Sequence, residues 1–95
     1  MRLRYTLEAA AELDQVLTTI EDKSPSGARN VRLRIQAVAN LLLQHPRAGQ
    51  LTRGRRLRRM RAAPYPYLVF YQVIDDEIII HGVRHSARRP SSMPD

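Results

Sequence analysis

The chain has 95 residues, no cysteine and a formal net charge of +7 at pH 7. A chain of this length can bury one modest core, and the lack of cysteine excludes disulfides, thiolate metal sites and cysteine nucleophiles. No apolar run is long enough to span a bilayer, and strand-like sequence follows Met1 in place of a signal peptide, so we expect a cytoplasmic protein without a membrane partner.

A first amphipathic helix is predicted after a short strand that contains Leu3 and Tyr5. Thr6 can cap this helix, and Glu8 lies in its first turn, where the helix dipole favours an acid. Apolar residues recur at the three-and-four spacing of one buried face, which we expect to hold Ala10, Leu13, Val16, Leu17 and Ile20. The opposite, solvent-facing side is expected to hold Glu8, Glu12, Gln15, Thr19 and Asp22.

A second helix is predicted beyond a turn at residues 24–27. The sequence Ser-Pro-Ser-Gly there is typical of a helix break, and the apolar pattern that follows ends near His45 and Pro46. We expect the buried face of this helix to hold Val31, Ile35, Val38, Leu41 and Leu42. Two helices joined by so short a turn indicate an antiparallel hairpin.

Three strands are predicted in the second half of the chain. Residues 47–54 have the composition of a loop, and residues 57–61 are a strand candidate. Residues 67–74 and 78–83 are rich in β-branched and aromatic side chains, and the acidic turn at 75–77 joins them into a predicted β-hairpin.

The order of these elements predicts one α+β domain over residues 1–95. We expect an N-terminal β-strand, an antiparallel helical hairpin packed on a small, mostly antiparallel sheet, and a C-terminal β-hairpin. The tail at 87–95, which contains two prolines, is predicted to be flexible.

The positive charge is concentrated in one part of the chain. Residues 24–74 contain ten arginines and no aspartate or glutamate. A surface that only needs to be soluble usually carries both signs of charge, whereas clustered guanidinium groups suit phosphates or an acidic partner. We therefore interpret the block as a binding surface. A GC-rich genome would explain the preference for arginine over lysine, but not the missing acids.

The C-terminal part of the chain resembles a known family. The segment PYPYLVFYQV at residues 64–73 is followed by the acidic turn, by Ile78-Ile79-Ile80 and by VRHSAR at residues 83–88. Together with the basic LRRMR before the aromatic strand, this resembles the RelE/ParE superfamily of toxins from type II toxin-antitoxin systems. The resemblance covers almost the whole chain, and it implies a RelE/ParE-like domain, no cofactor and a cognate antitoxin as partner.

The family divides by mechanism, and the residues favour one branch. The resemblance implies that nucleases of the RelE type carry basic residues at certain positions, and Arg59, Arg61 and Arg88 match three of these positions here. Leu68, however, takes the place of an arginine in the aromatic strand, and no tyrosine follows Tyr71. Leucine cannot stabilise a developing phosphate charge. The ParE-like branch, which inhibits DNA gyrase, is therefore favoured.

Two other functions stay open. The chain would be a RelE-like, ribosome-dependent mRNA endoribonuclease if Arg59, Arg61, His85 and Arg88 assembled a degenerate active site. It would be a plain nucleic-acid-binding module if the arginine block were its footprint. For the favoured function, we expect the antitoxin to wrap the helical hairpin and the sheet with its C-terminal segment.

The residues expected to contact the target are mainly arginines. Arg59 and Arg61 share one face of their predicted strand, and Arg55 and Arg56 lie just before the strand begins. His85 and Arg88 complete the set. No catalytic residue is assigned for the favoured function. Each of these arginines could instead be an ordinary solvated side chain without a binding role.

The histidines and aromatic residues are given mainly structural interpretations. His81 and His85 share a face if their strand is regular, but His81 lies in a buried-looking run and is expected to be packed and hydrogen-bonded. His85 is equally open to a packing or an acid-base role. No ligand-like spacing predicts a metal site. The aromatic side chains could stack on bases, but alternation favours packing for Tyr65, Tyr67, Phe70 and Tyr71.

Overall fold

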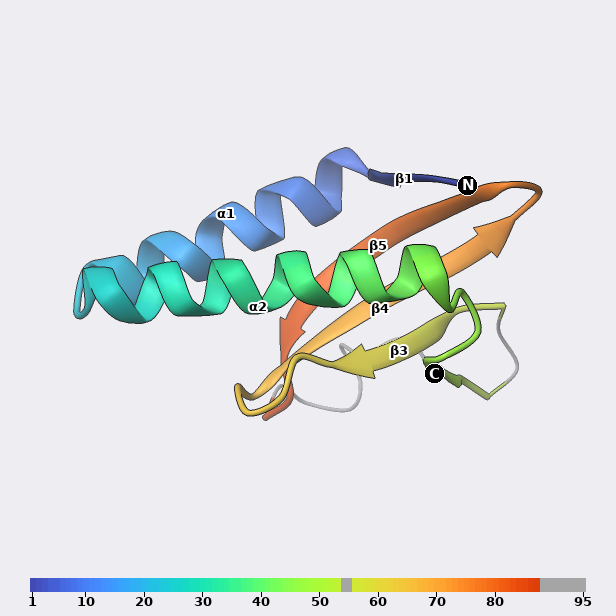
Figure 1. Cartoon of the computed structure of the whole chain (residues 1–95). Helices are drawn as coiled ribbons and strands as arrows, with labels where there is room; N and C mark the ends of the chain where they lie inside the picture. Colours follow the sequence, from blue (N-terminus) through green and yellow to red (C-terminus); the bar gives the residue numbers. More distant parts are fainter. Residues whose placement is uncertain (54–55, 88–95) are drawn as a thin grey trace.

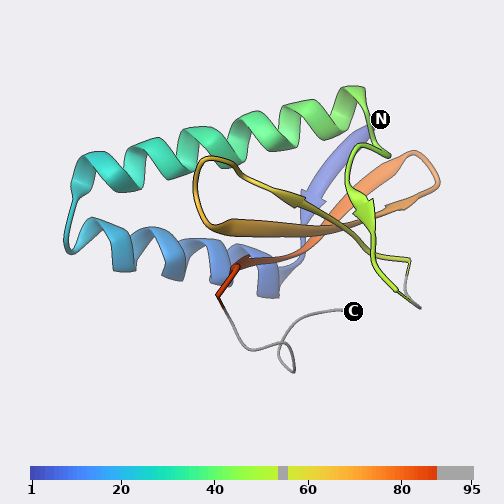
Figure 2. The same cartoon turned by 90° about the horizontal axis from the view of Figure 1, so that it is seen from below.

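The computed structural model describes residues 1–53 and 56–87. Two helices and five strands follow one another as β1 (Arg2–Tyr5), α1 (Leu7–Glu21), α2 (Pro25–Gln44), β2 (Gln50–Leu51), β3 (Arg58–Arg61), β4 (Tyr67–Ile74) and β5 (Glu77–His85). The helices form the predicted antiparallel hairpin, which covers one face of the sheet (Figures 1 and 2). No helix in the described part of the chain is long and apolar enough to cross a membrane.

The five strands form one mixed sheet in the order β1-β5-β4-β3-β2. Only β1 and β5 pair in parallel, and the other neighbours are antiparallel. The two helices form the crossover that carries the chain away from β1, and β5 later returns beside it, as parallel neighbours require. The predicted α+β architecture with a mostly antiparallel sheet is therefore confirmed.

Side-chain caps fix where both helices begin. The Thr6 hydroxyl accepts a hydrogen bond of 3.0 Å from the backbone nitrogen of Ala9, as predicted. The predicted turn at 24–27 is only partly right, because the second helix already begins at Pro25. Ser24 caps it by accepting a 3.0 Å bond from the Gly27 nitrogen, and proline fits the first helical position because that position needs no amide donor.

Two of the predicted core positions on the helices are wrong. Ala10 is exposed and its neighbour Ala9 is fully buried instead, while of the predicted pair Leu41 and Leu42, Leu41 is 39% exposed and Leu42 is fully buried. Each residue turns a helix by about 100°, so a periodic pattern alone locates the edge of the buried stripe only to within one residue. The other predicted positions are buried or half-buried: Leu13, Val16, Leu17, Ile20, Val31, Ile35 and Val38.

The strands follow the prediction with two differences. The strand candidate before the hairpin is confirmed as β3, and β4 has the predicted bounds. β2 lies inside the segment predicted to be a loop, because two residues that pair with β3 leave no periodic signal. β5 is longer than predicted and ends at His85, since it continues to pair with β4 up to Tyr67.

One irregularity decides which way the side chains of β5 point. Phe70 pairs with Gly82, but the next residue, Tyr71, pairs with Ile80, so His81 is left without a partner in the ladder. A bulge of this kind shifts the alternation of side chains on the bulged strand. As a result the core residues Ile80 and Val83, three positions apart, both pack beneath the helices.

Candidate functional site

The face of the sheet opposite the helices carries the predicted target-binding arginines. On this outer face, Arg59 of β3 pairs with Phe70 of β4, and Arg61 pairs with Leu68. Leu68 pairs in turn with Arg84 of β5. Paired residues of antiparallel strands point to the same side, so Arg61, Leu68 and Arg84 form one row across the sheet.

Arg59 and Arg61 share a face, as predicted, and both are exposed. The Arg59 guanidinium reaches the side-chain oxygen of Gln50 at 3.5 Å, and neither arginine takes part in an ion pair that the described residues form. Arg56 is also exposed, whereas Arg55 and Arg88 lie outside the described residues. Of the predicted target-binding residues, the structure therefore brings Arg59 and Arg61 together.

Arg84 was not predicted as a site residue, and it is held in place by the first helix. Its Nε atom lies 3.1 Å from Glu12 Oε2, and its guanidinium lies 5.9 Å from the centre of the Phe70 ring. The other Glu12 oxygen accepts a 3.2 Å hydrogen bond from the Val83 nitrogen. The expectation that Glu12 faces solvent is thus wrong. The pairing of β1 with β5 ends at Ile80, so β1 does not cover the edge of β5 at Val83, and Glu12 of α1 contacts that edge instead.

The two histidines lie on different faces of the sheet. His81 Nε2 is hydrogen-bonded to Gln72 Oε1 at 3.1 Å, and the residue is half-buried, which agrees with the predicted packed role. His85 instead meets the ring of Tyr67 edge-on, with the ring centres 5.3 Å apart, and its Nδ1 accepts a bond from the Ala87 nitrogen. A shared face would require a regular strand, and the bulge at His81 removes that condition.

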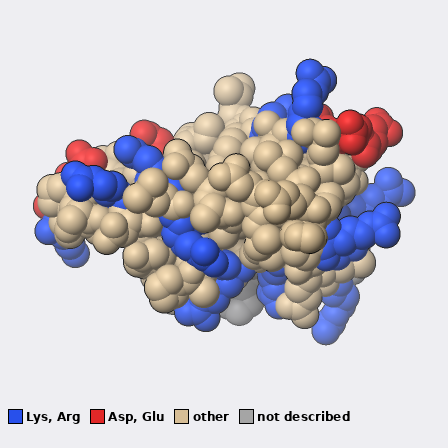
Figure 3. Space-filling view, viewed as in Figure 1, with Lys and Arg blue, Asp and Glu red and all other residues tan. Residues whose placement is uncertain are grey.

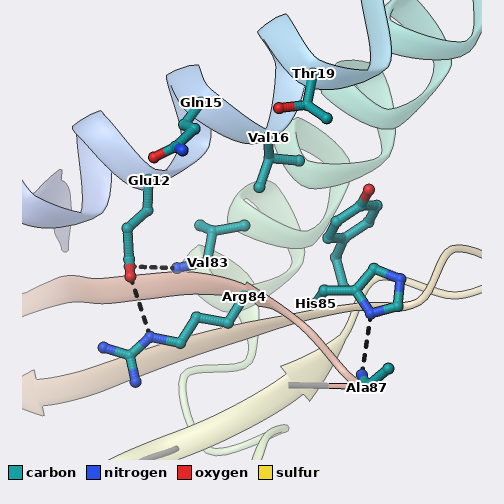
Figure 4. A pocket seen from close by; sticks show the side chains of 9 residues that line it. Glu12, Gln15, Val16, Thr19, Val83, Arg84, His85 and Ala87 are labelled. Carbon is teal, nitrogen blue, oxygen red and sulfur yellow. Dashed lines mark hydrogen bonds and ion pairs between the residues drawn. The ribbon is translucent and has the colours of Figure 1, made fainter. Parts of the chain in front are cut away.

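His85 lines a pocket that includes Arg84 but neither Arg59 nor Arg61. The pocket has a volume of about 450 Å³ and lies between α1 and the end of β5 (Figure 4). Val16 and Val83 form part of its apolar wall, and Glu12 and Arg84 meet at one end. Among the described residues, no group of three or more histidine, aspartate or glutamate side chains is placed to hold a metal ion.

The aromatic residues are mainly structural, as predicted. Tyr71 and Phe70 are fully buried, and Tyr65 and Tyr67 pack against the core. The Tyr71 hydroxyl accepts a 2.8 Å bond from the Gly49 nitrogen and donates one of 2.8 Å to the Pro46 oxygen. Burial raises the pKa of this phenol above its ordinary value, although the bond from Gly49 and the charge of Arg58 act against the rise.

Comparison with known proteins identifies the family. The family model described as the ParE toxin of the type II toxin-antitoxin system, parDE, matches residues 3–90. The chain belongs to this ParE toxin family. Two curated relatives agree: toxin RelE2 of Caulobacter vibrioides is 33% identical over 84 residues, which cover 88% of this chain and 93% of the relative. “Putative toxin Y4kP” of Sinorhizobium fredii is 32% identical over 79 residues, which cover 83% and 82%.

A solved structure supports the fold of this ParE-family chain. The structure titled as the chromosomal ParDE TA system from P. aeruginosa superimposes with a TM-score of 0.78, covering 90% of this chain and 95% of its own. At 23% identity, this likeness concerns the fold alone. The predicted resemblance to the RelE/ParE superfamily is therefore confirmed, and the chain is a type II toxin of that superfamily.

Proposed function

We propose that this ParE-family toxin inhibits DNA gyrase, that it binds its target through the outer face of its sheet, and that a cognate antitoxin neutralises it in the cytoplasm. Arg59 and Arg61 are the central contacts of the proposed surface, because they are exposed and point the same way. Arginine offers forked donors for carboxylate or phosphate groups on a partner. The proposal requires no enzymatic activity of the toxin itself.

The observation that carries this choice over a nuclease is the row Arg61, Leu68 and Arg84. An mRNA nuclease must stabilise charge on a phosphorane and transfer protons to and from ribose and leaving oxygens. The middle position of this row is a leucine, and Arg84 already pairs with Glu12. The row therefore lacks a charge at its centre.

The groups that transfer protons are also poorly placed for nuclease chemistry. The Tyr71 hydroxyl is buried and makes two hydrogen bonds to the backbone of residues 46–49. His85 lies on the helix face, and His81 on the outer side is bonded to Gln72. A general acid or base must reach the proton that it transfers. Within the described residues, these three side chains do not meet that condition beside Arg59 and Arg61.

The alternative is a ribosome-dependent mRNA endoribonuclease, and one comparison favours it. A relative that is 33% identical carries the name toxin RelE2. In that function Arg59 and Arg61 would contact the message, with His85 and Arg88 as further site residues. The alternative would need His85 to turn away from Tyr67, where the structure has its ring.

The antitoxin is proposed as the partner that covers the apolar surface of the helical hairpin. The solved structure with the same fold is titled as a ParDE toxin-antitoxin system. Leu33 and Leu41 of α2 are 56% and 39% exposed, and Leu7 of α1 is 90% exposed. A contiguous exposed apolar patch is typical of a surface that binds another protein, and we propose that these leucines belong to such a patch.

Two assays with the purified chain test the proposal. Gyrase should lose supercoiling activity on a relaxed plasmid, equimolar antitoxin should restore it, and translating ribosomes should keep their messages intact. The double variant Arg59→Ala/Arg61→Ala should lose inhibition, whereas the control Arg29→Ala/Arg32→Ala, on α2, should keep it. Message cleavage at A-site codons without any effect on supercoiling would establish the nuclease instead.

A further inference from the structure

The arginine block that the sequence presents as one run is divided in space. Arg29, Arg32 and Arg34 lie on the first half of α2, while the arginines from Arg47 onward follow its far end. A helix rises about 1.5 Å per residue, so Arg29 and Arg47 are separated by most of the length of α2. In Figure 3, blue side chains lie at both ends of the molecule and also along its lower side between the ends.

The second group lies in the segment 47–59, whose sequence contains six arginines and no acid. We call the described residues of this segment, 47–53 and 56–59, the arginine hairpin. Gln50 pairs with Arg59 and Leu51 with Arg58, and beyond these pairs Thr52 donates both its amide and its hydroxyl to the Leu57 oxygen. Figure 2 shows β2 at the edge of the sheet, beside β3.

The base of the arginine hairpin is held rigidly by the core. The buried Tyr71 hydroxyl bonds to Gly49 and Pro46, and the Arg58 guanidinium donates to the backbone oxygen of Gly49 at 2.9 Å. A β-carbon on Gly49 would lie 2.6 Å from the Tyr71 ring, so only glycine allows this close approach. The base of the hairpin is therefore preorganised for a partner.

Three arginines of the hairpin take part in no ion pair that the described residues form. Arg47, Arg53 and Arg56 are exposed, and the ion pairs found among the described residues involve none of them. Leu51 is the one large apolar side chain that is exposed in the described part of the hairpin. Interfaces with proteins usually have an apolar centre, whereas interfaces with DNA are more polar and strongly positive. The composition of this surface therefore favours a nucleic acid over an acidic protein.

We propose that the arginine hairpin binds the phosphate backbone of double-stranded DNA, with Arg47, Arg53 and Arg56 as the contacts. A two-stranded β-ribbon fits the major groove of B-form DNA, which is about 12 Å wide, while the major groove of an RNA duplex is deep and narrow. The proposed DNA contacts are Arg47, Arg53 and Arg56, whereas the central contacts of the proposed gyrase surface are Arg59 and Arg61. This binding would give the toxin a direct contact with DNA without requiring gyrase.

Fluorescence anisotropy with a labelled DNA duplex of mixed sequence tests this proposal. The triple variant Arg47→Gln/Arg53→Gln/Arg56→Gln should bind on the order of tenfold more weakly, and the slope of log affinity against log salt should fall by about 2.7, at 0.9 for each lost phosphate contact. The matched control Lys23→Gln/Arg29→Gln/Arg32→Gln removes the same charge from exposed residues at the other end of the molecule. It should bind within about twofold of the parent chain, as expected when no phosphate contact is lost.

Three outcomes would overturn the proposal. These are the absence of salt-sensitive DNA binding by the parent chain, equal losses in the two triple variants, and equal affinity for an RNA duplex of the same length. Thermal melts check that both triple variants are folded, and if the hairpin triple unfolds, the single variants Arg53→Gln and Arg56→Gln replace it. Since the assay contains no gyrase, its result is independent of the supercoiling assay.

Discussion

The phenol of Tyr71 and the backbone nitrogen of Gly49, 22 residues apart in sequence, are joined by a buried hydrogen bond of 2.8 Å. The same phenol donates to the Pro46 oxygen, so one core side chain fixes the chain between α2 and β2. This contact links the core to the segment that presents the arginine hairpin. It also makes Tyr71 a structural residue, although its position in an aromatic strand beside arginines suggests base stacking.

Replacement of Tyr71 by phenylalanine should destabilise the domain by about 1–3 kcal/mol, because it leaves a buried donor and a buried acceptor without partners. Urea denaturation of the parent and variant chains measures this loss. Tyr67→Phe is the matched control, since the structure gives that residue a ring contact with His85 and no hydroxyl bond among the described residues. Equal stability of Tyr71→Phe and the parent would contradict the prediction.

Gly49→Ala should destabilise the domain by about 1–3 kcal/mol through overpacking. The new β-carbon would lie 2.6 Å from the ring and hydroxyl of Tyr71 and 2.9 Å from the Arg59 backbone oxygen, so the loop or the ring must move. Thermal unfolding provides the measurement, with Ala48→Ser at the exposed neighbouring position as control. An unchanged melting midpoint in Gly49→Ala would contradict the prediction and would show that the loop moves to accommodate the methyl group at little cost.

The stability of the domain should decrease with pH above about 10. Burial raises the pKa of Tyr5 and of Tyr71 above the ordinary value of 10.0, so the folded state keeps protons that the unfolded state has already released. The contribution is fully present below the unfolded pKa and is lost as the pH rises through the folded one. Denaturation at several alkaline pH values measures the slope, and Tyr71→Phe should make it shallower. A slope of the opposite sign would refute the expectation.

Glu12→Ala should destabilise the domain by about 1–3 kcal/mol, because the Val83 amide loses its acceptor and Arg84 loses an ionic partner. The Glu12 and Arg84 side chains are only 25% and 21% exposed, so solvent replaces these contacts poorly. Glu12→Gln should recover part of the loss, since it keeps one acceptor oxygen. The control Glu21→Ala, at an exposed position near the end of α1, should change urea stability little, and similar effects of both alanine variants would argue against a specific role of Glu12.

Single alanine substitutions at Arg59 and Arg61 should weaken gyrase inhibition gradually, by about 1 kcal/mol each, because each removes one exposed charged contact. A catalytic residue would instead lower a rate a hundredfold or more. Dose-response curves of supercoiling inhibition distinguish these cases, with Arg29→Ala as the control for lost charge. The prediction fails if one substitution abolishes all activity while the other has no effect.

Local sequence determined the elements of this protein because their signals lie within a few residues of one another. Thr6 caps one helix, the three-and-four apolar spacing defines the faces of both helices, and the aromatic strand with its acidic turn forms the C-terminal hairpin. The same local residues carried the resemblance to the RelE/ParE superfamily, which the family model confirms. The placement of Arg59 and Arg61 on one face also followed from simple alternation.

Only the tertiary structure decided the relationships between distant segments. The bulge at His81 separates the two histidines, and whether alternation continues through a strand depends on its pairing with a neighbouring strand. The bonds from Glu12 to Val83 and from Tyr71 to Gly49 join residues 71 and 22 positions apart. Such contacts depend on how the helices and strands pack, so no periodicity within one segment encodes them. The division of the arginine block arises in the same way, because most of the length of α2 separates Arg29 from Arg47.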